Sequence, residues 1–174
     1  MAAKRQVITG LCLLAGMGLA VSSDSIRGLV FAPAQDSIAR PGMELPHLPV
    51  VDTRGKPEDL KNAARGGKRV IVFYSGACDT CRMVLPELAP FPPGVRLLMV
   101  HEGADESFES PANLGLAHAE VFLDRNGVFR RSFSMPALPT ILFVDERGIL
   151  LHGLVGAHAR GRVQEKLKEF AARR

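Results

Sequence analysis

The sequence lacks several features that mark common protein classes. Its 174 residues contain no tryptophan, one tyrosine and three cysteines, which is too few cysteines for a disulfide-rich scaffold. It has no GxxxxGK[ST] phosphate loop, no GxGxxG turn and no HExxH motif, so the commonest nucleotide-binding and zinc-protease classes have no support. The net charge of +4 is not gathered into a basic stripe interleaved with aromatic residues. We therefore predict no nucleic-acid partner.

The chain begins with an export-type segment. Lys4 and Arg5 precede an uncharged run over 7–21, and a serine-rich patch follows. A basic start, an apolar stretch and small residues after it are typical of a signal peptide. The run approaches the about 20 apolar residues that span a membrane, so a retained anchor is the alternative to cleavage. We expect residues 1–34 to be a signal peptide or membrane anchor with a linker, and residues 35–174 to form one domain.

The remaining chain alternates between predicted strands and helices. Predicted strands cover 47–51, 68–74, 95–101, 140–144 and 149–155; the second and third are dense apolar runs typical of strands buried on both faces. Predicted helices cover 58–64, 79–89 with a kink at Pro86, and 160–174. Residues 102–111 are acidic and predict a loop, and 112–133 give no clear pattern. This order predicts an α/β fold with a mixed sheet flanked by helices.

The chemistry is concentrated in the motif Cys78-Asp79-Thr80-Cys81, which follows a predicted buried strand and opens a helix. A cysteine at a helix start faces unpaired backbone N–H groups and the positive end of the dipole, and both stabilise the thiolate. The thiolate is the nucleophile in disulfide exchange. Cys81 lies one turn further on the same face, so it can attack the Cys78 sulfur and release a bound substrate. We expect Cys78 to attack and Cys81 to resolve.

Other uses of this cysteine spacing have less support. A structural zinc site needs four ligands, but Cys12 of the export segment is the remaining thiol and the histidines show no paired ligand spacing. We therefore predict no metal. A structural disulfide across so short a loop constrains the unfolded chain little. Haem attachment needs a histidine where Arg82 stands.

The sequence resembles the thioredoxin-fold thiol:disulfide oxidoreductases of the exported TlpA/ResA-like group. The matching stretch runs from Gly42 to Phe170, and the residues that carry it are Val72–Arg82, Pro86 and Leu138–Asp145. A weaker similarity, over Gly153–Val155 and the helix after it, is to accessory thioredoxin-like proteins of methylamine dehydrogenase. The resemblance implies a thioredoxin fold behind the N-terminal hydrophobic helix, at the periplasmic face of a bacterial inner membrane.

The resemblance also implies the parts of the site. The redox group is a Cys78–Cys81 disulfide, with no organic cofactor. A cis peptide bond precedes Pro139 and turns the backbone of Leu138 towards the cysteines, where a client peptide pairs as an added strand. The catalytic residues are thus predicted to be Cys78, Cys81 and Pro139, and the substrate-binding residues Leu138, Ala77, Asp79 and Thr80.

The sequence departs from the family at informative positions. Ala77 stands where many members have tryptophan, and Thr80 where many have proline. Val72 occupies the position of the buried acid of cytosolic thioredoxins, so the usual proton acceptor for the second cysteine is missing. Glu87, Glu120 and a water molecule are the candidate replacements.

Two further residues, Asp79 and His101, bear on the chemistry of the motif. Asp79 puts a negative charge beside Cys78, which is expected to raise the pKa of that thiol and to favour a reducing protein. His101 follows a buried strand; a place near the site is conceivable, but a hydrogen-bonded strand-end histidine is the commoner arrangement.

The motif and the family resemblance together imply two function classes. The first is an oxidoreductase that acts on disulfides of exported client proteins, such as an apocytochrome or a multi-disulfide enzyme subunit, and takes electrons from a membrane thiol-disulfide carrier. The alternative is a non-catalytic assembly or metallochaperone factor that uses the fold to hold a client. Copper chaperones of this fold usually space their cysteines CxxxC and add a distant histidine, so the CxxC spacing favours the first class.

Overall fold

The computed structural model describes residues 40–103, 110–133, 135 and 137–173. The predicted export segment, the domain boundary at residue 34 and Cys12 lie outside these residues. Within the described part of the chain, no helix is long and apolar enough to cross a membrane.

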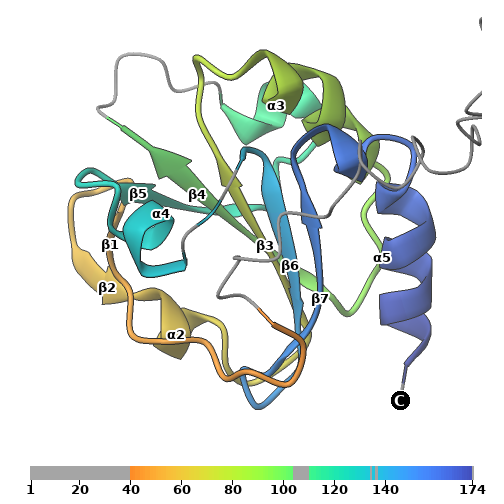
Figure 1. The fold of residues 1–174 in the computed structure, drawn as a ribbon, viewed down its shortest axis with the longest axis horizontal. Helices are drawn as coiled ribbons and strands as arrows, with labels where there is room; N and C mark the ends of the chain where they lie inside the picture. Colours follow the sequence, from red (N-terminus) through yellow and green to blue (C-terminus); the bar gives the residue numbers. More distant parts are fainter. Residues whose placement is uncertain (1–39, 104–109, 134, 136, 174) are drawn as a thin grey trace, which may run out of the picture. The chain divides into compact units, whose positions relative to one another are not determined.

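The described residues form a seven-stranded mixed sheet in the order β2-β1-β5-β4-β3-β6-β7 (Figure 1). The strands are β1 (Pro49–Asp52), β2 (Pro57–Asp59), β3 (Arg69–Tyr74), β4 (Arg96–Glu102), β5 (Glu120–Asp124), β6 (Thr140–Val144) and β7 (Leu150–Val155). β3, β4 and β5 run parallel, whereas β6 and β1 pair antiparallel with β3 and β5. The predicted α/β fold with a mixed sheet is confirmed.

β3 lies at the centre of the sheet, between β4 and β6, and all six of its residues are buried. Its β-branched and aromatic side chains fit a strand that is covered on both faces. Its last parallel register pair joins Tyr74 to His101 of β4. Because parallel strands end at the same edge of a sheet, the segments that follow β3 and β4 meet there.

Helices cover both faces of the sheet. They are α2 (Leu60–Ala63), α3 (Asp79–Val84), α4 (Val128–Phe133) and α5 (Val163–Ala172), with 3-10 turns η1 (Leu85–Leu88), η3 (Pro111–Leu114) and η4 (Gly156–Ala159). Phe73 of β3 stacks on Phe129 of α4 with ring centroids 4.2 Å apart, and Phe143 of β6 packs edge-on against Phe170 of α5 at 5.4 Å. Phe143 pairs with Val70, and Val70 and Phe73 point to opposite faces because side chains alternate along a strand. Thus α4 and α5 lie on opposite faces (Figure 1).

The structure corrects several predicted boundaries. The helix predicted over 58–64 is shorter, because Pro57–Asp59 pairs with β1 as an edge strand and Asp59 then caps α2. The helix predicted over 79–89 ends as an α-helix at Val84 and continues as the 3-10 turn η1, since Pro86 cannot donate to the preceding turn. The final helix occupies 163–172 rather than 160–174, and its buried residues are Val163, Leu167 and Phe170.

The unassigned stretch 112–133 contains most of η3, all of β5 and α4. β5 has no strict alternation to reveal it, because three of its five residues are consecutive and buried. Asp124 ends the strand and accepts hydrogen bonds from the backbone N–H groups of Val128 and Phe129, each at 2.9 Å. This carboxylate satisfies free amides at the start of α4.

Candidate functional site

The cysteine motif lies where β3 leaves the sheet. Ser75–Ala77 form a short loop, and Cys78 is the N-cap residue of α3 with extended backbone angles. Its sulfur accepts a hydrogen bond from the backbone N–H of Cys81 at 3.1 Å. Hydrogen bonding of this kind favours the thiolate over the thiol. α3 has only six residues, so few peptide dipoles add to this local effect.

The two cysteines differ in exposure. Cys81 is 1% exposed and belongs to the hydrophobic core, whereas Cys78 is only partly buried. The structure joins them in a disulfide with a Cα–Cα distance of 5.2 Å. This distance lies inside the range that disulfides accept. An external disulfide can therefore reach Cys78 but not Cys81, which is the arrangement that an attacking and a resolving cysteine require.

Asp79 does not stand as an isolated charge beside Cys78. Its carboxylate forms an ion pair with the guanidinium of Arg82, three residues later on α3, and both side chains are more than half exposed. Arg82 also donates from Nη1 to the carbonyl oxygen of Gly76 at 3.2 Å. The positive charge of Arg82 offsets the negative charge of Asp79, a contribution that the sequence argument about Asp79 omitted.

Pro139 lies beside the end of β3. The Leu138–Pro139 peptide bond is cis, as the family resemblance predicts. Thr140, the next residue, is the register partner of Phe73 near the end of β3, so Pro139 lies at the same sheet edge as the motif. The Pro139 carbonyl accepts from the N–H of Gly156 at 2.7 Å, and the Thr140 hydroxyl donates to the Ala137 carbonyl at 2.8 Å. These bonds fix the start of β6 on both sides of the proline.

The predicted substrate contacts divide by exposure. Ala77 and Asp79 are exposed beside the motif and Thr80 is partly buried, whereas Leu138 is 9% exposed. Met83 is 49% exposed, the single large apolar side chain so exposed among the described residues. Solvent-accessible side chains, including Ala77 and Met83, therefore lie next to the cysteines in the chain, where an incoming peptide can contact them.

A small cavity of about 10 Å³ lies behind the motif, and Tyr74, Cys81 and Arg82 contribute to its wall. No carboxylate is among the described residues that line it. Val72, at the position of the acid in cytosolic thioredoxins, is fully buried in β3. Arg82 is the charged residue among the described residues that line the cavity, and a guanidinium stabilises a thiolate rather than accepting a proton.

The two candidate acceptors for the Cys81 proton are engaged elsewhere. Glu87 accepts from the Gly161 N–H at 2.7 Å with its carboxylate, and so faces the segment before α5. Glu120 forms an ion pair with Arg96, the first residue of β4, towards the opposite end of that strand from His101. The structure therefore supports neither carboxylate as the partner of Cys81.

His101 lies beneath the motif loop. Its Nε2 atom accepts a hydrogen bond from the backbone N–H of Gly76 at 3.3 Å, and its ring packs edge-on against Tyr74 with centroids 5.2 Å apart. It is 0% exposed. Both arrangements that the sequence left open hold together: His101 is a hydrogen-bonded histidine near the end of β4, and it lies at the motif. The usable signal was its place at the end of a strand next to β3.

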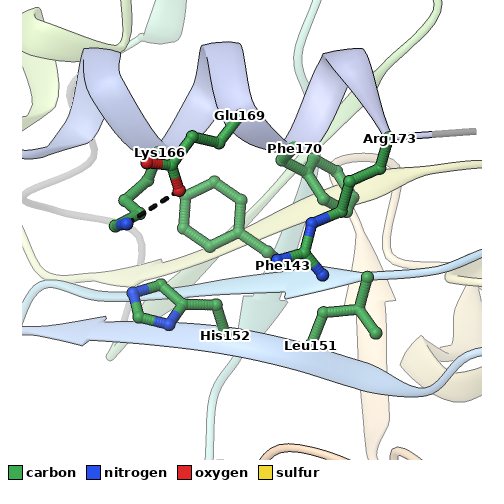
Figure 2. A pocket seen from close by; sticks show the side chains of 7 residues that line it. All are labelled: Phe143, Leu151, His152, Lys166, Glu169, Phe170 and Arg173. Carbon is green, nitrogen blue, oxygen red and sulfur yellow. Dashed lines mark hydrogen bonds and ion pairs between the residues drawn. The ribbon is translucent and has the colours of Figure 1, made fainter.

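A second hollow lies away from the cysteines, between β7 and α5 (Figure 2). It holds about 60 Å³, with Leu151 and His152 on the strand side and Lys166, Glu169, Phe170 and Arg173 on the helix side. Burial lowers the pKa of His152, and the positive charges of Lys166 and Arg162 lower it further. Among the described residues, no three His, Cys, Asp or Glu side chains are placed to hold a metal ion.

Comparisons with known proteins agree with this geometry. No family model matches the chain. It is 26% identical over 138 residues to the thiol-disulfide oxidoreductase ResA of Bacillus thuringiensis, covering 74% of this chain and 78% of that protein. The ResA protein of Bacillus cereus matches to the same extent.

Solved structures establish the fold. A secreted disulfide oxidoreductase of Mycobacterium tuberculosis, homologous to DsbE of Escherichia coli, superposes with a TM-score of 0.58 at 21% identity, covering 73% of this chain and 96% of that one. A DsbE-type thiol:disulfide interchange protein from Chlorobium tepidum gives 0.56 at 20% identity, covering 75% and 98%. These likenesses show a thioredoxin fold, and the capping Cys78 with its disulfide to Cys81 makes the chain similar to the ResA-type thiol-disulfide oxidoreductases.

Proposed function

We propose that this protein reduces disulfides of exported client proteins at the periplasmic face of a bacterial inner membrane. Residues 1–34 deliver it there as a cleaved signal or as an anchor, and a membrane thiol-disulfide carrier supplies its electrons. The observation that carries the proposal is the pairing of a partly exposed, helix-capping Cys78 with a buried Cys81.

The reaction takes two exchange steps. The Cys78 thiolate attacks one sulfur of the client disulfide, forming a Cys78–client bond and releasing the other client sulfur as a thiolate. The Cys81 thiolate then attacks the Cys78 sulfur, forming the Cys78–Cys81 disulfide and releasing the second client thiolate. The client gains two electrons and the motif loses two. The carrier returns them by the same exchange in reverse.

The residues around the motif hold the client during these steps. Ala77 and Met83 offer exposed apolar contacts on either side of the cysteines, and Asp79 and Thr80 border them. Leu138 and the cis Pro139 lie at the same sheet edge, where an extended client segment can pair with backbone groups. Backbone pairing is tolerant of side-chain identity, which suits an enzyme that serves more than one client sequence.

The local charges favour a reductant. Asp79 and Arg82 form an ion pair, so neither sign dominates beside Cys78. The short α3 adds little dipole, and one amide hydrogen bond remains as the main stabilisation of the thiolate. A moderately stabilised thiolate corresponds to a stable disulfide in the oxidised form and to a low reduction potential.

Cysteine variants of the full chain test the assignment, with insulin as the disulfide substrate and dithiothreitol as the electron source. Cys78→Ser is expected to abolish turnover and form no adduct, whereas Cys81→Ser is expected to accumulate a mixed disulfide between Cys78 and an insulin chain. Turnover that survives Cys78→Ser would refute the assignment. Insulin binding by both variants without any turnover in the wild type would support the non-catalytic assembly factor instead.

A further inference from the structure

His101 is a buried polar side chain of β4 that is hydrogen-bonded to the loop before Cys78. The side chain is 0% exposed. His101 is the sixth residue of β4 and the register partner of Tyr74 at the end of β3. Burying an imidazole is unfavourable unless its polar atoms are bonded. Its Nε2 atom is bonded to the Gly76 amide, two residues before Cys78.

The direction of this bond defines the state of the ring. A backbone N–H can only donate, so Nε2 must carry a free lone pair and the ring proton must lie on Nδ1. The ring is therefore neutral when the bond is present. The carboxylates of the adjacent positions, Glu102 and Asp124, point to the other face and bind Arg130 and the first amides of α4.

Gly76 is held through both of its backbone polar groups, which belong to two successive peptides. His101 accepts its N–H and Arg82 donates to its carbonyl oxygen at 3.2 Å. The backbone of Cys78 is also held, because its N–H donates to the Ser75 carbonyl at 3.2 Å. A shift of the Gly76 peptide would carry Cys78 with it and disturb the bond between its sulfur and the Cys81 amide.

We propose that His101 is a positioning residue for Cys78: its neutral Nε2 acceptor fixes the Gly76 peptide and thereby the direction and reactivity of the attacking sulfur. The proposal rests on the proposed function in one respect, since it takes Cys78 as the attacking group. It gives the buried histidine a role at a motif where no carboxylate lines the adjacent cavity among the described residues.

Three substitutions of His101 separate its role as a hydrogen-bond acceptor from its role in filling space in the core. His101→Gln places an amide oxygen near the position of Nε2, His101→Asn is too short to reach it, and His101→Leu removes all polarity. His152→Leu is the matched control, because His152 also packs on an aromatic ring but towards the other end of the hairpin. The readout is the alkylation rate of Cys78 by iodoacetamide in the reduced full chain at pH 7, located by peptide mass, with the melting temperature of each variant.

We expect His101→Asn and His101→Leu to slow alkylation of Cys78 about fivefold, the effect of one lost hydrogen bond of ordinary net strength. His101→Gln and His152→Leu are expected to keep the wild-type rate. Equal rates in the Gln and Asn variants, whether fast or slow, would overturn the acceptor role. If the leucine variant does not fold, the Gln and Asn pair still decides. Because alkylation needs no client, failure here is distinct from failure of the insulin assay, which tests the proposed function.

Discussion

His101 and His152 lie on the same sheet, each against an aromatic ring, yet in different surroundings. His101 contacts Tyr74 and accepts the Gly76 amide hydrogen at the motif end, whereas His152 contacts Phe143 between β7 and α5, close to the cations of Lys166 and Arg162. One histidine holds a loop through a directed bond. The other packs in the interface between β7 and α5, which we call the seam. Protonating it there is unfavourable because it is buried and close to positive charges.

The two regions around these histidines differ in the same way. At the motif, the backbone of a loop is held by polar side chains from separate elements. In the seam, Phe170 packs on Phe143, and Lys68 donates to the carbonyls of Phe170 and Ala171 at the end of α5. We therefore expect substitutions at the motif to change thiol chemistry with little loss of stability, and substitutions in the seam to do the reverse.

The largest predicted effect is on stability in the seam. Phe170→Ala removes a ring that is 3% exposed, and we expect the free energy of unfolding to fall by about 3–5 kcal/mol, as for other buried aromatic truncations. Urea denaturation measures it. The alkylation rate of Cys78 in the folded variant is expected to stay at the wild-type value, and a large change in that rate would break the separation of the two regions.

The next effect is electrostatic and concerns the thiol alone. Asp79→Asn leaves Arg82 unpaired beside the motif and is expected to lower the pKa of Cys78; Arg82→Gln leaves Asp79 unpaired and is expected to raise it. Because both groups are exposed, each shift is expected to be below about one unit, or within about tenfold in thiolate fraction. Thiolate absorbance against pH measures both. Shifts in the same direction for the two variants would contradict the charge-balance argument.

The smallest predicted effect is the pH dependence that His152 contributes to stability. Its pKa in the folded protein lies below the ordinary value of 6.5, so the unfolded chain binds the proton more readily. The stability contribution is present above pH 6.5 and is lost as the pH falls through and below that value. We expect His152→Gln to reduce the drop in melting temperature between pH 7.5 and about pH 5.5. The exposed His118→Gln is the control, and an equal drop in wild type and His152→Gln would contradict the assignment.

Sequence patterns predicted the parts of the fold that one element determines by itself. β3, the strands β6 and β7, and the helix α5 were each predicted from a local sequence pattern, and each forms in the structure close to its predicted range. β2 was not predicted, because an edge strand of three residues has no period of its own and forms through pairing with β1. The export segment stays a prediction.

The candidate site divides in the same manner. Cys78, Cys81 and the cis bond before Pro139 followed from a motif and a family resemblance, and the structure shows the disulfide and the cis bond. The contacts of Arg82 and His101 with Gly76 were not predicted. They depend on how α3 turns back over its own loop and on the parallel alignment of β3 with β4, and neither is encoded in the spacing of residues.

The most direct test of the central claim is the reduction potential of the Cys78–Cys81 pair in the full chain. It is measured by equilibration with dithiothreitol or glutathione buffers and alkylation read by mass, because the protein has no tryptophan and a single tyrosine for fluorescence. A reductant of exported disulfides predicts a value near or below about −250 mV. A value above about −180 mV would contradict that claim and identify an oxidant or an isomerase.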